Sequence, residues 1–252
     1  MTDSKEELKR KVPDPQPGHG ETAPKIQLEL RQSLERRVRA NPNDPDVFLE
    51  LAQIYRDEHR PNEAKRVLKQ AIQIFPNDPN ILWQFEEAVL ARSLQQFREA
   101  NDLASRVNSV EADETLESSQ KDWTEQRIKI CKTLLQRDAS KHHLRVVLAE
   151  ALIDADQFEA AIEELQPILD GEAFAPQAYL LLGRAEIYLG RQLDAMRSLR
   201  MSCMRREVPA PLKIKLASLR LLCETSESMG VTASSKHYRA ALQAAESELE
   251  TS

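Results

Sequence analysis

The sequence predicts an all-α protein, a right-handed α-solenoid of about five to six stacked antiparallel helix pairs, some of them degenerate. The first supporting observation is a Pro-Asn-Asp-Pro signal at residues 42–45 that returns at residues 76–79, a shift of 34 residues. A period of this length is the sequence signature of solenoids built from helix pairs. The second observation is composition, because only six glycines occur among 252 residues and strong helix formers are abundant.

Two capped amphipathic helices account for one period. Asp44 and Asp78 lie at expected N-cap positions, where a carboxylate accepts hydrogen bonds from the free N–H groups of the first turn. A proline follows each of them at the first helical position, where a missing N–H group costs nothing. Helices are predicted at about residues 46–58 and 62–74, each with apolar residues at i, i+3, i+4 and i+7. Neither helix can bury its apolar stripe alone, so the pair must stack on neighbouring pairs.

The segment 45–78 resembles a tetratricopeptide repeat, whose pattern is Trp-x2-Leu-Gly-x2-Tyr, then Ala-x3-Phe, then Pro. The matching residues here are Phe48, Leu51, Ala52, Tyr55, Ala64, Leu68 and Pro76. The spacing returns in a fourth repeat at Leu148, Ala149, Leu152, Ala161 and Leu165, and in a fifth at Tyr179, Leu182, Gly183, Ala195 and Leu199. The resemblance extends over about residues 26–248, and small residues such as Ala52 and Gly183 occupy the place where paired helices touch.

Composition shifts divide the chain into four parts. Residues 1–24 are rich in proline and glycine and are predicted to be a disordered N-terminal tail. An N-terminal stack is expected over 25–112, and a C-terminal stack with a polar capping hairpin over 122–248. Between them, residues 113–121 are predicted to be an acidic linker or irregular segment, because they lack an apolar stripe.

The second repeat is expected to begin at Pro79 and to contain two helices. Phe97, Ala100 and Ala104 supply the stripe of its second helix, after a turn that is two residues longer than usual. A further helix is predicted to end at about Arg137, where it resembles the second helix of a degraded third repeat.

Composition also excludes several classes of protein. The net charge is −6, so no nucleic-acid partner is expected, because duplex binding usually requires a basic footprint. No stretch approaches the roughly 18 apolar residues of a membrane span, and the charged start of the chain does not resemble a secretory signal. Cys131, Cys203 and Cys223 are few, odd in number and widely spaced, which indicates reduced thiols and a cytoplasmic location.

The sequence contains no motif for catalysis. There is no phosphate-binding loop, nucleophile elbow, zinc-protease helix or paired-cysteine metal motif. His142 and His143 are adjacent, so they point to different sides of a helix and cannot share a metal ion in the i, i+4 manner. We therefore expect no enzyme activity, no catalytic residue, no metal and no cofactor.

The resemblance implies a candidate peptide groove, because ligands of such repeats lie in the concave groove formed by the first helices. Carried over position by position, the groove residues are Asp46, Leu49, Gln53, Arg56, Trp83, Glu87, Val146, Glu150, Gln177, Leu180, Arg184 and Tyr188. The family's carboxylate clamp needs Lys and Asn, which neither Leu49 with Gln53 nor Leu180 with Arg184 supplies, so a role in capturing chaperone tails is not expected. Trp83 is either an aromatic anchor for the peptide or a packing residue between repeats.

A second candidate surface is basic. Its residues are Arg197, Arg200, Arg205, Arg206, Lys213 and Lys215. Such a patch could dock an acidic partner, and the alternative is that these residues form ordinary solvated helix faces.

These observations favour a non-enzymatic protein–protein interaction scaffold that binds a peptide or helix of a partner protein in the concave groove. One alternative is a self-associating structural or assembly-factor module. Another is an accessory subunit of an enzyme, since a fold alone does not determine function.

Overall fold

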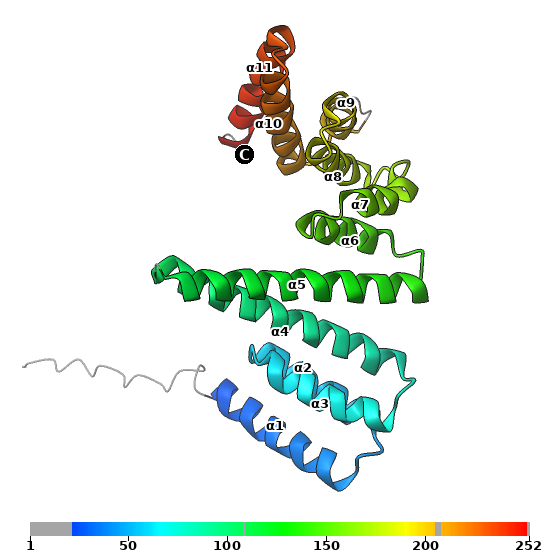
Figure 1. The fold of residues 1–252 in the computed structure, drawn as a ribbon. Helices are drawn as coiled ribbons and strands as arrows, with labels where there is room; N and C mark the ends of the chain where they lie inside the picture. The colour runs from blue at the N-terminus through cyan, green and yellow to red at the C-terminus, as the bar shows by residue number, and fades with distance from the viewer. Residues whose placement is uncertain (1–21, 108, 205–207, 251–252) are drawn as a thin grey trace, which may run out of the picture. The chain divides into compact units, whose positions relative to one another are not determined.

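The computed structural model describes residues 22–107, 109–204 and 208–250. The helices in this part are α1 (Thr22–Ala40), α2 (Pro45–Asp57), α3 (Pro61–Ile74), α4 (Pro79–Arg106), α5 (Val110–Arg137), α6 (His142–Asp154), α7 (Phe158–Leu165), α8 (Ala175–Tyr188), α9 (Gln192–Cys203), α10 (Leu212–Ser228) and α11 (Thr232–Glu250), with one 3-10 turn at Gln166–Ile168. The described residues contain no strand, which confirms the all-α class (Figure 1). Most of the predicted tail lies outside these residues, although α1 already begins at Thr22.

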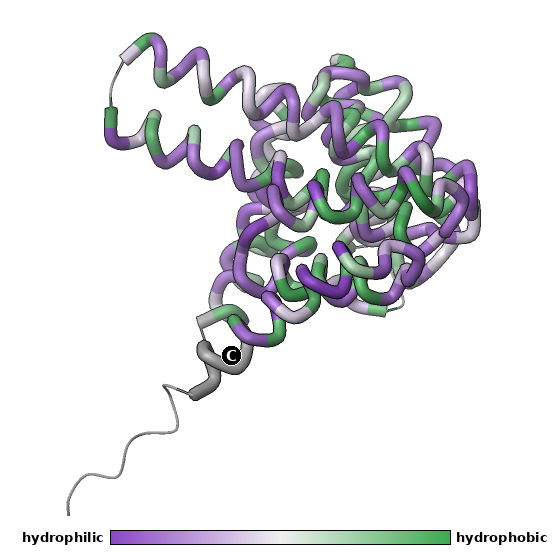
Figure 2. The backbone as a smooth tube through the Cα atoms, turned by 90° about the horizontal axis from the view of Figure 1, so that it is seen from below, coloured by the Kyte–Doolittle hydropathy of each residue, from purple (hydrophilic) through white to green (hydrophobic). Residues whose placement is uncertain are grey.

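The chain forms two compact units, one ending at Ala88 and the other beginning at Val89, so that the division lies within α4. In both units, consecutive helices pack side by side as antiparallel neighbours, which confirms the predicted stacking of helix pairs. Apolar and polar segments alternate along the helices in Figure 2, as expected when each helix buries one stripe.

In the first unit, the predicted caps form. The Asp44 carboxylate accepts a hydrogen bond from the backbone N–H of Asp46 at 3.2 Å, and the Asp78 carboxylate accepts one from the N–H of Asn80 at 2.9 Å. Between these caps, α2 and α3 bury the stripes that their periodicity predicts. The fully buried side chains of this core include Leu34, Phe48, Leu68 and Ile81.

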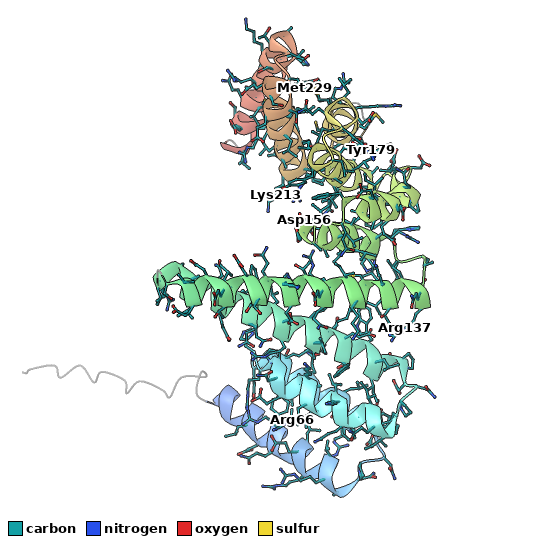
Figure 3. All side chains as sticks on the ribbon, viewed as in Figure 1. Arg66, Arg137, Asp156, Tyr179, Lys213 and Met229 are labelled. Carbon is teal, nitrogen blue, oxygen red and sulfur yellow. The ribbon has the colours of Figure 1, made fainter. Side chains whose placement is uncertain are left out.

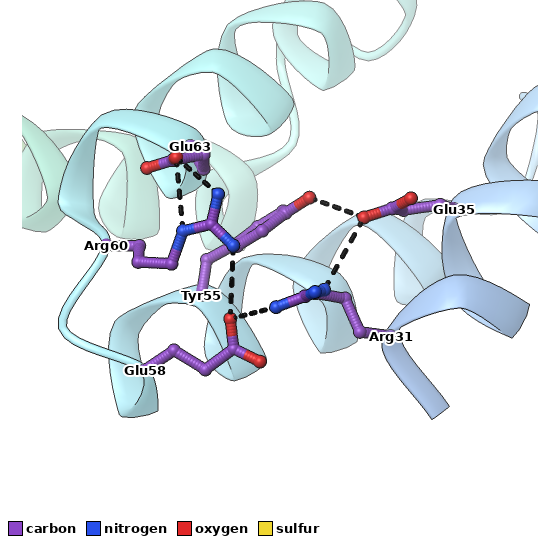
Figure 4. A network of polar contacts seen from close by, with 6 residues as sticks. All are labelled: Arg31, Glu35, Tyr55, Glu58, Arg60 and Glu63. Atoms are coloured by element: carbon purple, nitrogen blue, oxygen red, sulfur yellow. Dashed lines mark hydrogen bonds and ion pairs between the residues drawn. The ribbon is translucent and has the colours of Figure 1, made fainter. Parts of the chain in front are cut away.

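A polar network joins α1 to α2 and α2 to α3 (Figure 4). Arg31 of α1 forms an ion pair with Glu58, and the Tyr55 hydroxyl donates a 2.8 Å hydrogen bond to Glu35 of α1. The guanidinium of Arg60 lies 5.2 Å from the centre of the Tyr55 ring. Arg60 also pairs with Glu58 at 3.4 Å and with Glu63 at 2.6 Å. Three helices are therefore held in one orientation at a single polar junction.

In the second unit, two cores follow one another along the chain. The first lies among α5, α6, α7 and α8, and includes Leu148, Leu152 and Leu165. The second lies among α8, α9, α10 and α11, and includes Leu199 and Leu222. At the end of α7, Pro167 falls in the 3-10 turn, because a proline cannot continue the hydrogen-bond pattern of the helix.

A buried hydroxyl pair helps to tie α10 to the pair α8–α9. The Ser202 hydroxyl donates to the carbonyl of Pro176 at 2.7 Å and lies 2.9 Å from the Ser218 hydroxyl. Both serines are fully buried. Each hydroxyl therefore has a partner, which removes the cost of burying it unpaired.

Two expectations for residues 79–121 are wrong. The second repeat does not turn near Phe97, because α4 continues through it as one helix of 28 residues. Residues 113–121 are not a linker or irregular segment, because they lie inside α5, which also has 28 residues. The N-cap Ser109 accepts a hydrogen bond from the N–H of Ala112, and acidic residues in the first turn favour the positive end of the helix dipole. One polar contact joins the two helices, because the Ser93 hydroxyl of α4 donates to the Asp122 carboxylate of α5 at 2.9 Å.

We expect Ser118→Pro to disrupt α5, because a proline in a helix interior removes a hydrogen bond and clashes with the preceding turn, at a cost of about 3 kcal/mol or more. Ser118 is exposed, so the substitution tests the backbone alone. Circular dichroism should show a loss of helicity for Ser118→Pro and none for Ser118→Ala. Equal helicity in the two variants would mean that this segment is a linker after all.

Gly183→Leu should destabilise the α8–α9 pair. A Cβ atom at residue 183 would lie 2.7 Å from the Cγ atom of Leu199 and 3.4 Å from the carbonyl oxygen of Ala195. Leu199 is fully buried, so its side chain is surrounded by other protein atoms. Overpacking of this kind costs about 1–3 kcal/mol, which urea denaturation would measure. Ala244→Leu, at an exposed helical position, serves as the control and should leave the urea midpoint nearly unchanged.

Candidate functional site

A polar strip on α2 and the first part of α4 is the best-defined candidate surface of the first unit. Arg56 of α2 forms an ion pair with Glu87 of α4 at 2.6 Å and donates to the Gln84 side-chain oxygen at 3.1 Å. It also donates to Gln53, whose amide in turn donates to Asp57 at 2.8 Å. Three of the predicted groove residues, Gln53, Arg56 and Glu87, therefore meet. We call the surface formed by Gln53, Arg56, Gln84 and Glu87 the α2–α4 strip.

The surroundings of the strip combine charge with apolar surface. Asp46 is exposed, whereas Leu49 and Trp83 are half-buried. Asp46, Leu49, Gln53 and Arg56 follow one another at intervals of three or four residues, so they lie on one side of α2. The sequence interpretation omitted Gln84, although its position three residues before Glu87 places it on the same side of α4.

The Arg56 guanidinium is already paired within the protein. Its Nε atom is buried and has no hydrogen-bond partner among the described residues, while both of its terminal nitrogens are engaged. A carboxylate from a partner would therefore have to displace Glu87, which is itself exposed and able to move into solvent. The strip can exchange one ion pair for another, but it does not present an unpaired cation.

In the second unit, Arg127 of α5 connects two acidic residues of α6. Its guanidinium pairs with Glu150 at 3.3 Å and with Asp154 at 3.0 Å, and lies 5.4 Å from the centre of the Trp123 ring. Glu150 is a predicted groove residue, whereas Arg127 and Asp154 were not identified from the sequence. The signal available for Asp154 is its i, i+4 spacing from Glu150, which puts both carboxylates on one side of α6.

Val146 is not part of any surface. Its side chain is 4% exposed and packs in the core among α5, α6, α7 and α8. The family pattern wrongly predicted that Val146 lies in the groove. The helix α6 has neighbouring helices on two sides, so seven of its residues are buried and they do not form a single apolar stripe. A partner cannot reach Val146 without opening the core.

The fifth repeat places its four candidate residues along α8. Gln177 is exposed, Leu180 and Arg184 are half-buried, and Tyr188 is 63% exposed. The Tyr188 ring stacks on Phe158 of α7 with 4.9 Å between ring centres and 9° between planes. The two rings together present an aromatic surface at the end of α8.

Only some residues of the predicted basic patch are available to contact a partner. Lys215 pairs with Glu248 at 2.9 Å, and the Arg200 Nε donates to the carbonyl of Met196 at 3.2 Å. Arg197 and Lys213 are exposed. Arg205 and Arg206 lie outside the described residues.

The cysteines and histidines do not form a reactive centre in the described part of the chain. Burial raises the pKa of the Cys131 thiol and raises that of Cys203 to about 11, so both stay protonated at neutral pH. His142 and His143 are exposed at the start of α6. The described residues hold no group of three or more His, Cys, Asp or Glu side chains placed to bind a metal ion. Among the described helices, none combines the length and apolar character needed to cross a bilayer.

Glu186 of α8 occupies the position where the repeat pattern usually has Tyr, and its carboxylate is poorly solvated. Its Oε2 atom is buried and has no hydrogen-bond partner among the described residues. Desolvation raises the pKa of this carboxyl, and the negative charge of Asp194 adds to the rise, while a hydrogen bond with Ser198 opposes it. The ionised form therefore weakens the packing between α8 and α9.

Replacing the carboxyl with an amide should stabilise the protein at neutral pH. Because the pKa of Glu186 is higher in the folded protein than in the unfolded chain, its favourable contribution is present below the unfolded pKa and is lost as the pH rises through the folded pKa. Glu186→Gln should raise the urea midpoint at pH 7 and leave it close to that of the parent protein below pH 4. Glu159→Gln, on the exposed side of α7, is the control and should show no such pH-dependent gain. A lower midpoint for Glu186→Gln at pH 7 would contradict this assignment.

Comparison with known proteins agrees with this architecture. The family model of the tetratricopeptide repeat matches residues 45–78, which span α2 and α3. No curated protein sequence matches this chain significantly. Among solved structures, the MamA RS-1 ArsTM double mutant superposes with a TM-score of 0.55 at 14% identity, covering 82% of this chain and 97% of that chain. PilW, described as a widely conserved type IV pilus biogenesis factor, gives a TM-score of 0.45 at 18% identity, covering 88% of this chain and 87% of that chain.

The likeness to MamA supports the fold alone, because the identity is low. The matched repeat, its capped helices and the stacking of further helix pairs in both units lead to the same assignment. Residues 45–78 therefore form a tetratricopeptide repeat, which is the part of this chain that the family model matches.

Proposed function

We propose that this protein is a non-enzymatic scaffold that binds an extended or helical segment of another protein on the α2–α4 strip. Tetratricopeptide-repeat proteins in general serve as protein-interaction scaffolds. The observation that supports this location is the meeting of Gln53, Arg56 and Glu87, which come from two helices and are all groove residues by the family pattern.

The chemistry of the strip suits a polypeptide ligand. The amides of Gln53 and Gln84 can each donate and accept hydrogen bonds, as a partner's backbone requires. A carboxylate of the partner would exchange with Glu87 at Arg56, with a charge-assisted hydrogen bond replacing the internal one. Leu49 and Trp83, both half-buried beside the strip, supply the apolar surface that interface hot spots usually need.

The test compares two variants with the same chemical change. Gln53→Lys alters the strip, whereas Gln73→Lys alters an exposed position on α3, and both positions lie in helices of the first unit. We expect Gln53→Lys to weaken the binding of a partner captured from the native cell about tenfold, the change expected from losing roughly 1.4 kcal/mol at a central contact. Isothermal calorimetry with the purified partner would measure it.

Gln73→Lys should bind as the parent protein does, and both variants should keep the parent melting temperature. Equal affinities for all three proteins would mean that the binding surface is not the strip.

Light scattering of the parent protein tests the alternative of a self-associating module. A molecular mass that rises with protein concentration would favour self-association.

A further inference from the structure

A cavity of about 410 Å³ lies between α1 and α3, and α2 supplies part of its lining. It belongs wholly to the first unit, and its lining comes from helices other than α4, so it is separate from the α2–α4 strip. The lining residues are Glu35, Val38 and Arg39 of α1, Leu51 and Tyr55 of α2, and Arg66, Val67 and Gln70 of α3. Its volume is in the range of roughly 300–1,000 Å³ that is usual for ligand sites.

The inner part of the cavity is apolar. Leu51 and Val67 are 2% and 6% exposed, and Val38 is half-buried and packs against the same core. The polar groups near them are already paired, because the Tyr55 hydroxyl donates to Glu35 at 2.8 Å. An apolar side chain entering the cavity would therefore meet aliphatic carbon and would leave no buried polar group without a partner.

The rim of the cavity is cationic. Arg39 of α1 and Arg66 of α3 are both exposed, and within the described part of the chain neither has a carboxylate within ion-pair distance (Figure 3 labels Arg66). The one acidic residue of the lining, Glu35, is engaged by the Tyr55 hydroxyl and lies 3.7 Å from Arg31. Glu35 therefore does not neutralise the two rim arginines.

The charge of the surrounding helices has the same sign. α1 and α3 together contain eight Lys and Arg residues and three Glu residues, in a chain with a net charge of −6. A positive region on a negative protein attracts acidic partners selectively, because the rest of the surface repels them. This region is not evident from the sequence, because its cations are divided between two helices that are separated by α2.

We infer that this cavity, with Arg39 and Arg66 at its rim, is a docking site for an acidic segment of a partner protein. An apolar side chain of the segment enters the cavity and packs on Val38, Leu51 and Val67. Carboxylates on either side of that side chain pair with the two guanidinium groups, which bind planar carboxylates in bidentate geometry. The apolar interior distinguishes such a segment from a nucleic acid, which would use the cations but leave the cavity unfilled.

The probe for this inference is a short fluorescein-labelled peptide in which glutamates flank a central phenylalanine, and its binding is followed by fluorescence anisotropy. Arg39→Glu combined with Arg66→Glu should weaken the binding of this probe about tenfold or more, because two charge-assisted contacts become repulsive. Arg197→Glu combined with Lys213→Glu makes the same change in net charge at exposed positions of the second unit, and should change the affinity only slightly.

A variant without a change in charge tests the cavity itself. Gln70 is exposed and lines the cavity, so Gln70→Trp would fill it and leave both arginines in place. This variant should also lose about tenfold or more in affinity, provided that circular dichroism and the melting temperature match those of the parent. A probe with glycine in place of phenylalanine should bind the parent protein correspondingly less well.

Three results would overturn the inference. An equal loss in the Arg197→Glu, Lys213→Glu protein would mean that net charge alone attracts the probe. Unchanged binding in Gln70→Trp would mean that nothing enters the cavity. Displacement of the probe by an oligothymidine at lower concentration than by unlabelled peptide would assign the rim to nucleic acid. None of these results depends on the α2–α4 strip.

Discussion

The structure depends on one constraint, which is that each of the described helices buries its apolar stripe only against neighbouring helices. Ala64 and Leu68 of α3 are fully buried because α2 covers them, and Leu199 of α9 is fully buried because α8 and α10 cover it. This dependence makes small residues decisive at the closest approaches. Gly183 leaves room for Leu199, and any larger side chain there would push the two helices apart.

Polar contacts then orient the helices that apolar burial brings together. Tyr55 joins α2 to Glu35 of α1, and Arg127 joins α5 to two acidic residues of α6. Contacts of this kind contribute little free energy when exposed, but they select one arrangement among several that would bury similar area. Such rigidity is useful to a scaffold, because a preorganised surface loses less entropy when it binds. The α2–α4 strip and the cavity between α1 and α3 both depend on this fixed arrangement.

The errors of the sequence interpretation have a common physical cause. It treated residues 113–121 as irregular for want of an apolar stripe, and it placed a turn before Phe97 because the family pattern has one. The contact between α4 and α5 instead includes the hydrogen bond from Ser93 to Asp122, and a polar contact of this kind produces no hydrophobic periodicity in the sequence. Val146 was misplaced for the opposite reason, since α6 is buried on more sides than an outer helix of a stack.

The sequence by itself determined the helical class, the repeat at residues 45–78, and the caps at Asp44 and Asp78, because these depend on the order of residues along the chain. It also selected Gln53, Arg56 and Glu87 as candidates through the spacing of the family pattern. Only the tertiary structure decided that Arg56 is already paired with Glu87, and that Arg39 and Arg66 stand on either side of an apolar cavity. These contacts join residues far apart in the chain, and they follow from how neighbouring helices pack, which a linear pattern does not specify.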